Sequence, residues 1–337
     1  MKVVSFFAGA GGLDLGFEQA GYDVIWANEF DSEIWDTYAY NHPNTYLDRR
    51  SITDVSAEEV PDCDGIIGGP PCQSWSEAGA KRGIADKRGQ LFFDFIRILK
   101  AKQPKFFLAE NVSGMLQPAH KDALEHIQAL FREAGYHLTF HSVNVANYGI
   151  AQDRKRVFFV GIRSDLGLEF HFPLPSGICH RVLKDVIGDL QYTAQPRATG
   201  LTAEVPQCII PNHEYMTGGF SPIFMSRNRV RSWDEVSFTI QAGARQAPLH
   251  PSAPKMLFIE PNKRIFVPGK EKLYRRLSVR ECARIQTFPD DFIFLYRNIV
   301  SGYKMVGNAV PPQMAQIIAE AIKEQLQSIR NEISKKA

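Results

Sequence analysis

The chain has 337 residues, of which 44% are hydrophobic and 23% are charged, and its formal net charge is +2 at neutral pH. These values are typical of a globular protein and exclude a disordered or fibrous chain. No apolar run is long enough to span a membrane, and the first residues lack the pattern of a secretion signal. The five cysteines include no C-x-x-C pair, which argues against a disulfide framework and a zinc site. We therefore expect a cytoplasmic protein without metal or membrane association.

Predicted strands and helices alternate over the first 165 residues. Strands are expected at residues 3–7, 24–27, 65–67, 106–109 and 156–161, and helices at 13–20, 32–40, 91–100 and 120–134. This alternation predicts an α/β fold with a doubly wound, mostly parallel sheet. Ligands of such sheets bind beyond the carboxyl ends of the strands. Polar residues follow several of these strands, so we expect a ligand site there.

The turn after the first predicted strand is rich in glycine. Residues 7–12 read FAGAGG, and glycines there let the backbone approach a ligand at the N-terminus of the next helix. A G-x-G-x-x-G nicotinamide motif fails because residue 14 is Asp14. Glu29 ends the second predicted strand, where a carboxylate accepts hydrogen bonds from ribose hydroxyls. The pattern favours an adenosine-bearing ligand, with a purely structural turn as the alternative.

A cysteine follows two glycines and two prolines after the predicted strand at 65–67. In the sequence GGPPCQS of residues 68–74, the prolines fix their own backbone angles and favour an extended conformation before them. Cys72 is therefore presented from a stiff turn, as a nucleophile would be. The alternative is a small buried side chain without chemistry.

The charge of the chain is unevenly distributed. Residues 176–276 contain 14 Lys and Arg against 8 Asp and Glu, a net charge of +6, while the rest of the chain carries −4. This basic segment favours a polyanionic partner, and a solvated basic face is the alternative. After it, Pro311 and Pro312 favour a helix start, and apolar residues from Ile318 to Ile333 recur every three or four positions. We expect that helix to pack on the core.

The ordered motifs resemble those of the DNA (cytosine-5)-methyltransferases, especially bacterial restriction-modification members that methylate GGCC. They are FAGAGG at 7–12, Glu29, PPCQ at 70–73, ENV at 110–112, QDRKR at 152–156, RRLSVRECARIQTFP at 275–289 and GNAVP at 307–311. The resemblance implies a Rossmann-like S-adenosylmethionine-dependent methyltransferase fold with a second, smaller target-recognition domain. The expected catalytic and cofactor-binding domain comprises residues 1–175 and 277–337, and the recognition domain comprises residues 176–276.

The resemblance also implies four catalytic residues. Cys72 would add as a thiolate to carbon 6 of cytosine, and Glu110 would protonate or hydrogen-bond ring N3. Arg154 and Arg156, at alternate positions of an extended segment, would face and position the cytosine. The target base has to leave the stack of the duplex, and residues 76–83 have the composition of a lid over DNA.

A binding site for S-adenosylmethionine follows from the same resemblance. Its expected residues are Phe7, Gly9, Gly11, Gly12, Glu29, Ser51, Ile52, Pro70 and Asn308. The chain departs from the family pattern at Ser51, where the family usually has Asp before Ile. We therefore expect a weakened contact to the adenine amino group, which Asp48 or Asp54 could replace only after a shift of register.

The basic segment, with NHEY at 212–215 and FMSRNRVR at 224–231, resembles the recognition region of family members that methylate the inner cytosine of GGCC. Arginines at alternate positions of a strand-like run project to one side and can reach guanine O6 and N7. Arg227, Arg229 and Arg245 are therefore expected to read guanines of double-stranded DNA. We expect a monomer, because a palindromic site can be methylated one strand at a time, and protection of DNA from a cognate restriction endonuclease.

Three other functions fit parts of the sequence. A tRNA methyltransferase of the same family would share the catalytic motifs, although the long basic segment favours duplex DNA. A thiol hydrolase would need a histidine base for Cys72, and none of the nine histidines has a setting that suggests one. A non-catalytic, sequence-specific DNA-binding protein would have no use for PPC, ENV and QDRKR together.

Overall fold

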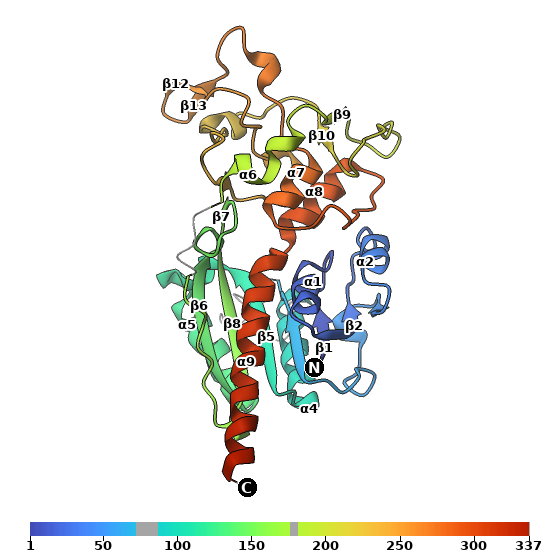
Figure 1. Ribbon diagram of the computed structural model, residues 1–337, viewed down its shortest axis with the longest axis vertical. Coiled ribbons are helices and arrows are strands. Elements are labelled where there is room, and N and C mark those ends of the chain that lie inside the picture. Colours follow the sequence, from blue (N-terminus) through green and yellow to red (C-terminus); the bar gives the residue numbers. More distant parts are fainter. Residues whose placement is uncertain (72–86, 176–180, 337) are drawn as a thin grey trace.

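The protein consists of two lobes stacked along its long axis (Figure 1). The computed structural model describes residues 1–71, 87–175 and 181–336, and the side chains of residues 1–71, 91–175 and 181–328. A large sheet with flanking helices forms the sheet lobe, and residues 181–310 form the second lobe. The last helix, α9 (Pro312–Lys336), leads from the second lobe back along the sheet.

One mixed sheet forms the centre of the sheet lobe, with the strand order β3-β2-β1-β4-β5-β8-β6. Its strands are β1 (Lys2–Phe6), β2 (Asp23–Asn28), β3 (Tyr46–Asp48), β4 (Gly65–Gly68), β5 (Phe106–Val112), β6 (Tyr136–Asn144) and β8 (Lys155–Arg163). Strands β3 to β5 in this order are parallel, and β8 runs antiparallel between β5 and β6. The predicted α/β fold with a mostly parallel sheet is confirmed.

Strand β6 is an element that the sequence pattern missed. Only Tyr136 and Val143 of its nine residues are buried, and polar side chains such as His137 and His141 are exposed. It therefore lacks the continuous apolar run that marks β4 and β5. Pairing with β8 along its whole length holds β6 in the sheet, so backbone hydrogen bonding defines this strand.

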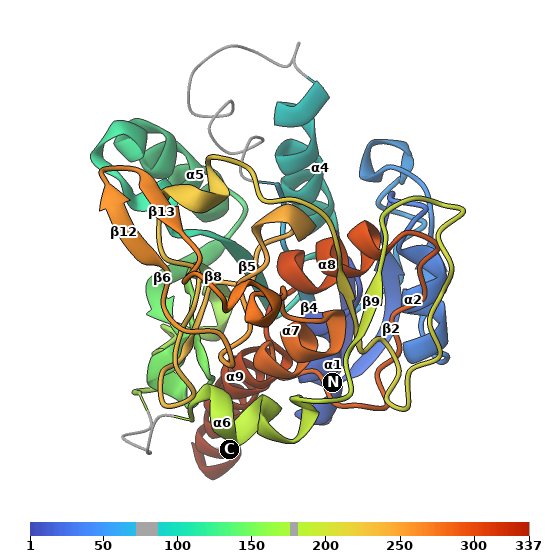
Figure 2. The same cartoon turned by 90° about the horizontal axis from the view of Figure 1, so that it is seen from above.

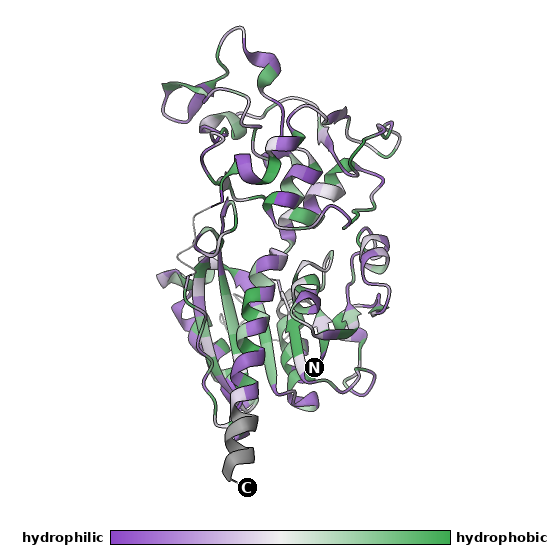
Figure 3. Ribbon diagram, in the orientation of Figure 1, coloured by the Kyte–Doolittle hydropathy of each residue, from purple (hydrophilic) through white to green (hydrophobic). Residues whose placement is uncertain are grey.

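Helices cover both faces of the sheet. Helices α1 (Gly12–Gln19) and α9 cover one face, and α4 (Lys87–Lys102) and α5 (Lys121–Glu133) cover the other. Alternate residues of a strand point to opposite faces of the sheet. Leu108 therefore packs in the core on the side of α1 and α9, and Phe107 packs in the core on the side of α4 and α5. Figure 3 shows these apolar strands between amphipathic helices. The predicted apolar stripe of α9 is confirmed for its described side chains, which include Ile318 and Ile322.

The second lobe has short elements joined by irregular chain. They are α6 (Leu183–Ile187), β9 (Gln195–Arg197), β10 (Glu214–Met216), β12 (Leu257–Glu260), β13 (Lys263–Ile265), α7 (Val279–Ile285) and α8 (Ile299–Asn308). Seen from above, α7 and α8 lie near the middle and the β12–β13 hairpin lies at the periphery (Figure 2). Residues 277–309, which the sequence groups with the catalytic domain, share a core with the basic segment. The functional division into two domains stays a prediction.

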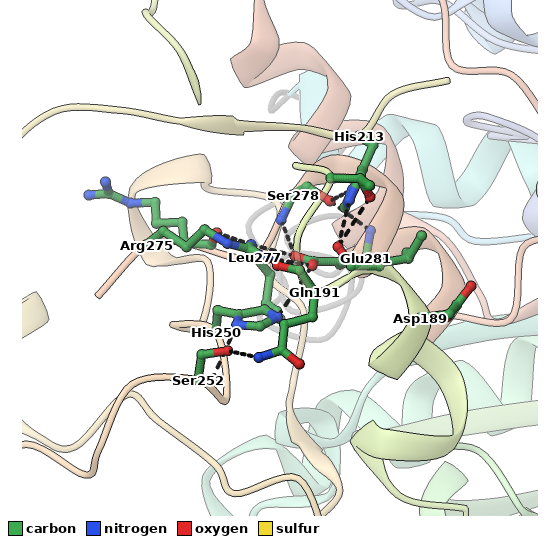
Figure 4. A network of polar contacts seen from close by, with 12 residues as sticks. Asp189, Gln191, His213, His250, Ser252, Arg275, Leu277, Ser278 and Glu281 are labelled. Atoms are coloured by element: carbon green, nitrogen blue, oxygen red, sulfur yellow. Dashed lines mark hydrogen bonds and ion pairs between the residues drawn. The ribbon is translucent and has the colours of Figure 1, made fainter. Parts of the chain in front are cut away.

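A buried polar network joins distant segments of the second lobe (Figure 4). Glu281 accepts hydrogen bonds from Arg275 at 2.7 and 2.8 Å and from the Ser278 N–H at 2.8 Å. His213 lies 2.8 Å from the Ser278 hydroxyl, and His250 Nε2 lies 3.5 Å from Glu281. Burial alone would raise the pKa of the Glu281 carboxyl, but the ion pair with Arg275 holds that pKa below its ordinary value. The ionised carboxylate therefore anchors the RRLSVRE motif to the basic segment.

Candidate active site

A cavity of about 400 Å³ lies at the carboxyl ends of β1, β2, β4 and β5, with the end of α8 on its opposite wall. Its position agrees with the ligand site expected for a doubly wound sheet. Its wall contains eight of the predicted site residues: Phe7, Gly9, Gly12, Glu29, Pro70, Glu110, Arg156 and Asn308. The motifs of residues 7–12, 110–112, 152–156 and 307–311 thus meet at one place, together with Pro70 and Pro71.

Glu29 organises one side of the cavity. Its Oε2 accepts a hydrogen bond from the Gly9 N–H and its Oε1 accepts one from the Asp31 N–H, both at 2.8 Å. Burial raises the pKa of the Glu29 carboxyl, while these two N–H groups favour its ionised form. Phe30, between two cavity-lining residues, is 71% exposed. Phe30 itself is not among the described wall residues.

Gly11 and Gly12 are required by the packing behind the turn. Gly11 has a φ of 88°, and a Cβ there would overlap the ring of His42. A Cβ at Gly12 would press on the Val310 carbonyl oxygen, where the chain enters α9. Gly12 belongs to the cavity wall, whereas Gly11 is not among the described wall residues. Gly11 therefore supports the turn from behind.

Ser51 and Ile52 follow the end of β3, whose Asp48 carbonyl accepts a hydrogen bond from the Glu29 N–H at 3.0 Å. The Ser51 hydroxyl caps a short 3-10 turn by accepting hydrogen bonds from the Thr53 hydroxyl at 2.8 Å and the Thr53 N–H at 3.4 Å. Ile52 is 2% exposed and packs in the core under α4. Neither residue belongs to the described cavity wall. Asp48 is no substitute, because it is ion-paired with Arg50 at 2.7 Å.

Glu110 and Arg156 form an ion pair on the cavity wall. They lie on the adjacent strands β5 and β8, with Arg156 Nε 2.9 Å from Glu110 Oε1. Their side chains are 12% and 17% exposed. Desolvation raises the pKa of the Glu110 carboxyl even though the positive charges of Arg156 and Arg154 oppose that shift. The site therefore contains an acid that keeps its proton to higher pH than an exposed glutamate.

The segment before the predicted nucleophile reaches the same cavity. The Asn111 side-chain amide donates a hydrogen bond to the Pro70 carbonyl at 2.9 Å, which joins the end of β5 to this segment. Both Pro70 and Pro71 line the cavity. Cys72 and residues 76–83, the predicted lid, lie outside the described residues.

Arg154 does not share the orientation predicted for it. Its guanidinium is 1% exposed and donates hydrogen bonds to the carbonyls of Ile240, Gly307 and Ala309 at 2.9, 3.1 and 2.9 Å. Arg154 lies between β7 (Gln152–Asp153) and β8, so the rule that alternate residues of one strand share a face does not apply. The prediction that Arg154 and Arg156 face the cytosine together is corrected for Arg154.

The three arginines predicted to read DNA have two different environments. Arg227 and Arg245 are exposed. Arg229 is only 6% exposed, and it donates hydrogen bonds to the carbonyls of Phe224 at 2.9 Å and Ile223 at 3.2 Å. Its guanidinium also stacks 4.8 Å from the centre of the Phe224 ring. Arg229 therefore supports the backbone beside Arg227, and its direct guanine contact stays a prediction.

A hollow of about 180 Å³ lies beside these arginines. Arg227, Gln241 and Gln246 are among its wall residues. Gln241 is exposed and Gln246 is half-buried. Reasoning from the sequence considered only cations here, although carboxamides also bind base edges and both glutamines stand in the singled-out run 239–246.

Two negative findings apply to the described part of the chain. Within it, no group of His, Cys, Asp and Glu has an arrangement that could hold a metal ion. Among its helices, none combines the length and hydrophobicity of a transmembrane segment.

Comparison with known proteins identifies the family of the chain. The model of the family described as C-5 cytosine-specific DNA methylase matches residues 1–324. The chain is 55% identical to the Type II methyltransferase M.FnuDI of Fusobacterium nucleatum, over 100% of this chain and 99% of that protein. It is 56% identical to M.NgoPII of Neisseria gonorrhoeae, over 97% and 96% of the two chains.

Solved structures support the same fold. The Entamoeba histolytica methyltransferase EhMeth superposes with a TM-score of 0.68 at 16% identity, covering 97% of this chain and 98% of its own. The Dnmt2 methyltransferase of S. pombe gives a TM-score of 0.65 at 15% identity, covering 98% and 99%. At these identities the likeness shows the Rossmann-like methyltransferase fold alone.

The fold is thus that of the Rossmann-like methyltransferases, and the chain belongs to the C-5 cytosine-specific DNA methylase family. It is a DNA (cytosine-5)-methyltransferase of the Type II restriction-modification kind. Membership implies S-adenosylmethionine as methyl donor and DNA as substrate. The thiol hydrolase and the non-catalytic DNA-binding protein are therefore excluded.

Proposed function

We propose that this enzyme methylates the inner cytosine of GGCC in duplex DNA through a covalent adduct with Cys72, and so protects that DNA from a cognate restriction endonuclease. The observation that carries the mechanism is the Glu110–Arg156 pair on the wall of a cavity that Pro70 and Pro71 also line. An acid with a raised pKa, a fixed cation and the segment leading to a cysteine are the groups that addition to a cytosine ring requires.

The cavity has a donor and acceptor set that fits S-adenosylmethionine. Glu29, held by two backbone N–H groups, keeps lone pairs that accept hydrogen bonds from ribose hydroxyls. Phe30, next to Glu29 in the chain, is 71% exposed, and we assign its ring to stacking on the adenine. Gly9 and Asn308 complete the wall on either side. When bound, the cofactor supplies an electrophilic methyl group.

Cytosine carbon 5 is a weak nucleophile, so the protein has to supply electrons to the ring. The Cys72 thiolate forms a bond to carbon 6 while Glu110 delivers its proton to N3, which gives a neutral enamine. Because Arg156 binds Oε1 of Glu110, we assign the transferred proton to Oε2. Carbon 5 then accepts the methyl group. Loss of the carbon 5 proton to a base re-forms the double bond, breaks the bond to Cys72 and returns the N3 proton to Glu110.

Site recognition is assigned to the exposed arginines of the second lobe. The side chains of Arg227 and Arg245 are free to reach guanine edges, and Gln241 and Gln246 add carboxamides beside them. The target cytosine has to leave the duplex to reach a cavity at the strand ends. Since each strand of a palindrome presents the same site, a monomer suffices.

The proposal is tested by transfer of labelled methyl from S-adenosylmethionine into duplexes that differ only in one GGCC or a scrambled site. Label in the GGCC duplex alone supports the assignment. Equal label in both duplexes removes the GGCC specificity, and label in a tRNA but in neither duplex favours the tRNA alternative. A GGCC duplex with 5-fluorocytosine at the inner position should form a stable complex with the wild type and none with Cys72→Ala. Absence of a covalent complex with the wild type would refute the adduct.

A further inference from the structure

Three buried side chains, those of Gln152, Arg154 and Gln286, meet at the junction of the two lobes. Their exposed fractions are 0%, 1% and 0%. Gln152 lies in β7, Arg154 follows this strand, and Gln286 is the C-cap residue of α7. None of them is among the described wall residues of the cavity, so the proposed chemistry does not account for them.

On one side, these side chains hold the start of residues 239–246, which we call the recognition segment. The Ile240 N–H donates to Gln152 Oε1 at 2.9 Å, and Arg154 donates to the Ile240 carbonyl at 2.9 Å. The Thr239 hydroxyl donates to the Asp153 carbonyl at 2.6 Å. Just before it, β11 (Ser237–Phe238) pairs with β7. The recognition segment thus has a fixed position relative to the end of the sheet lobe.

On the other side, the same side chains hold residues 307–309, which we call the cofactor wall because all three line the cavity. Arg154 donates to the carbonyls of Gly307 and Ala309. Gln286 donates to the carbonyls of Val306 at 2.8 Å and Ala309 at 3.3 Å. The Ala309 carbonyl therefore accepts hydrogen bonds from both Arg154 and Gln286, which uses both of its lone pairs.

A direct link closes the arrangement. Gln152 Nε2 donates to Gln286 Oε1 at 2.8 Å, so hydrogen bonds run without interruption from Ile240 to Ala309. The two backbones also touch, because a Cβ on Gly307 would overlap the backbone of Gln241 and Ala242. We use the name joint for the three side chains together with the backbone groups to which they are hydrogen-bonded.

Burial makes the joint sensitive to displacement. Its polar atoms are shielded from water, so a shift of the recognition segment against the cofactor wall would leave several of them without partners at once. One position of the recognition segment relative to the cofactor wall is therefore strongly favoured. Arg156, two residues after Arg154, belongs to the Glu110 pair, so the same stretch of chain also reaches the catalytic acid.

We propose that Gln152, Arg154 and Gln286 are positioning residues that couple docking of the DNA site to the cofactor wall. This inference rests on the proposed function, because it takes residues 239–246 as DNA-reading. A DNA site bound to the recognition segment fixes the position of that segment. Because the joint binds both segments, it then also fixes the position of residues 307–309. By linkage, the cofactor and the correct DNA site should each raise the affinity for the other.

The test measures this coupling with S-adenosylhomocysteine, the demethylated form of the cofactor, as probe. Its Kd is determined by calorimetry without DNA, with the GGCC duplex and with a duplex changed at one base pair. We expect the GGCC duplex to tighten probe binding in the wild type about tenfold, within the usual range of allosteric coupling. The coupling factor is the ratio of the probe's Kd without DNA to its Kd with the GGCC duplex. Gln152→Met and Gln286→Met keep the side-chain volume but remove the hydrogen bonds, and each variant should bring this ratio close to one. The double variant should add little, since both belong to one path.

Gln325→Met is the matched control. Gln325 also bridges two backbone groups of a distant residue, the N–H and the carbonyl of His171, but it does so on α9. Its coupling factor should equal that of the wild type. A wild type without coupling, or folded Met variants with wild-type coupling, would overturn the proposal.

Two further outcomes remain decisive. If the Met variants do not fold, Arg154→Lys takes their place, because a lysine keeps the charge but cannot bind three carbonyls in fixed directions. Retained coupling in that variant counts against the joint. If the wild type prefers a sequence other than GGCC, the site assignment fails, and the coupling is measured on the preferred sequence.

Discussion

The two lobes differ in how much of their backbone is paired in strands. In the sheet lobe the strand ladder satisfies the backbone, so Arg156 is free to pair with Glu110 at the cavity. In the second lobe the strands are short, and buried arginines hold short or irregular segments through their backbone carbonyls. Arg276 donates to the carbonyls of Met216, Gly218 and Gly219, and Arg280 binds those of Pro211, Pro289 and Phe292.

In both lobes, two arginines at alternate positions have different environments. Arg154 is buried while Arg156 lies on the cavity wall, and Arg229 is buried while Arg227 is exposed. A guanidinium has five N–H donors in a fixed plane, so one buried arginine can replace several missing backbone hydrogen bonds. Arg154 and Arg229 do this, although their sequence positions resemble those of groups that contact DNA. In an irregular lobe, exposure rather than spacing separates a DNA-reading arginine from a structural one.

The largest effect is expected at the ion pair of the sheet lobe. Glu110→Gln removes the proton donor and should lower the rate of methyl transfer by about 10² to 10⁴. Because the pKa of Glu110 is raised, its protonated fraction falls as pH rises through that pKa, and the wild-type rate should fall with it. Single-turnover rates across pH should show this alkaline decline in the wild type and in the exposed control Glu320→Gln. The same decline in Glu110→Gln would contradict the role.

A pair of variants in the second lobe sharpens the comparison directly. Arg227→Ala should lower discrimination for GGCC by about 1–3 kcal/mol and leave the melting temperature unchanged, because Arg227 is exposed. Arg229→Ala should instead lower the free energy of unfolding by about 1–3 kcal/mol, because it leaves buried carbonyls without donors. Relative kcat/KM values on two duplexes and thermal unfolding separate these effects. The reverse pattern would assign the reading role to Arg229.

A smaller effect is expected at the cofactor side of the sheet lobe. Glu29→Ala removes the acceptor of the Gly9 and Asp31 N–H groups and the predicted partner of the ribose. The Kd of S-adenosylhomocysteine should rise about tenfold, which corresponds to one lost charge-assisted hydrogen bond. Calorimetry without DNA measures it. An unchanged Kd would remove Glu29 from the cofactor site.

The smallest effect is expected at Ser51. Aspartate caps a helical turn as well as serine does, and the Ser51 hydroxyl faces Thr53 rather than the cavity. Ser51→Asp should therefore change the Kd of S-adenosylhomocysteine by less than about twofold. A clear tightening would restore the adenine contact expected from the family pattern.

Most of the sheet lobe could be read from local sequence. Apolar runs mark β1, β4 and β5, because a buried parallel strand needs apolar side chains on both faces. The cavity followed from those strands, since parallel strands bring their carboxyl ends to one edge, and eight predicted site residues line it. The sequence did not predict strand β6, because its place in the sheet depends on pairing with β8.

Folding alone decided which polar side chains remain free. The sequence around Arg154 does not predict its hydrogen-bond acceptors. These are the carbonyls of Ile240, Gly307 and Ala309, which lie about 90 to 150 residues away in the chain. The same holds for Arg229, whose carbonyl partners depend on how residues 223–229 turn back on themselves. Local patterns record what a residue is able to bind, whereas burial and long-range contacts determine what it does bind.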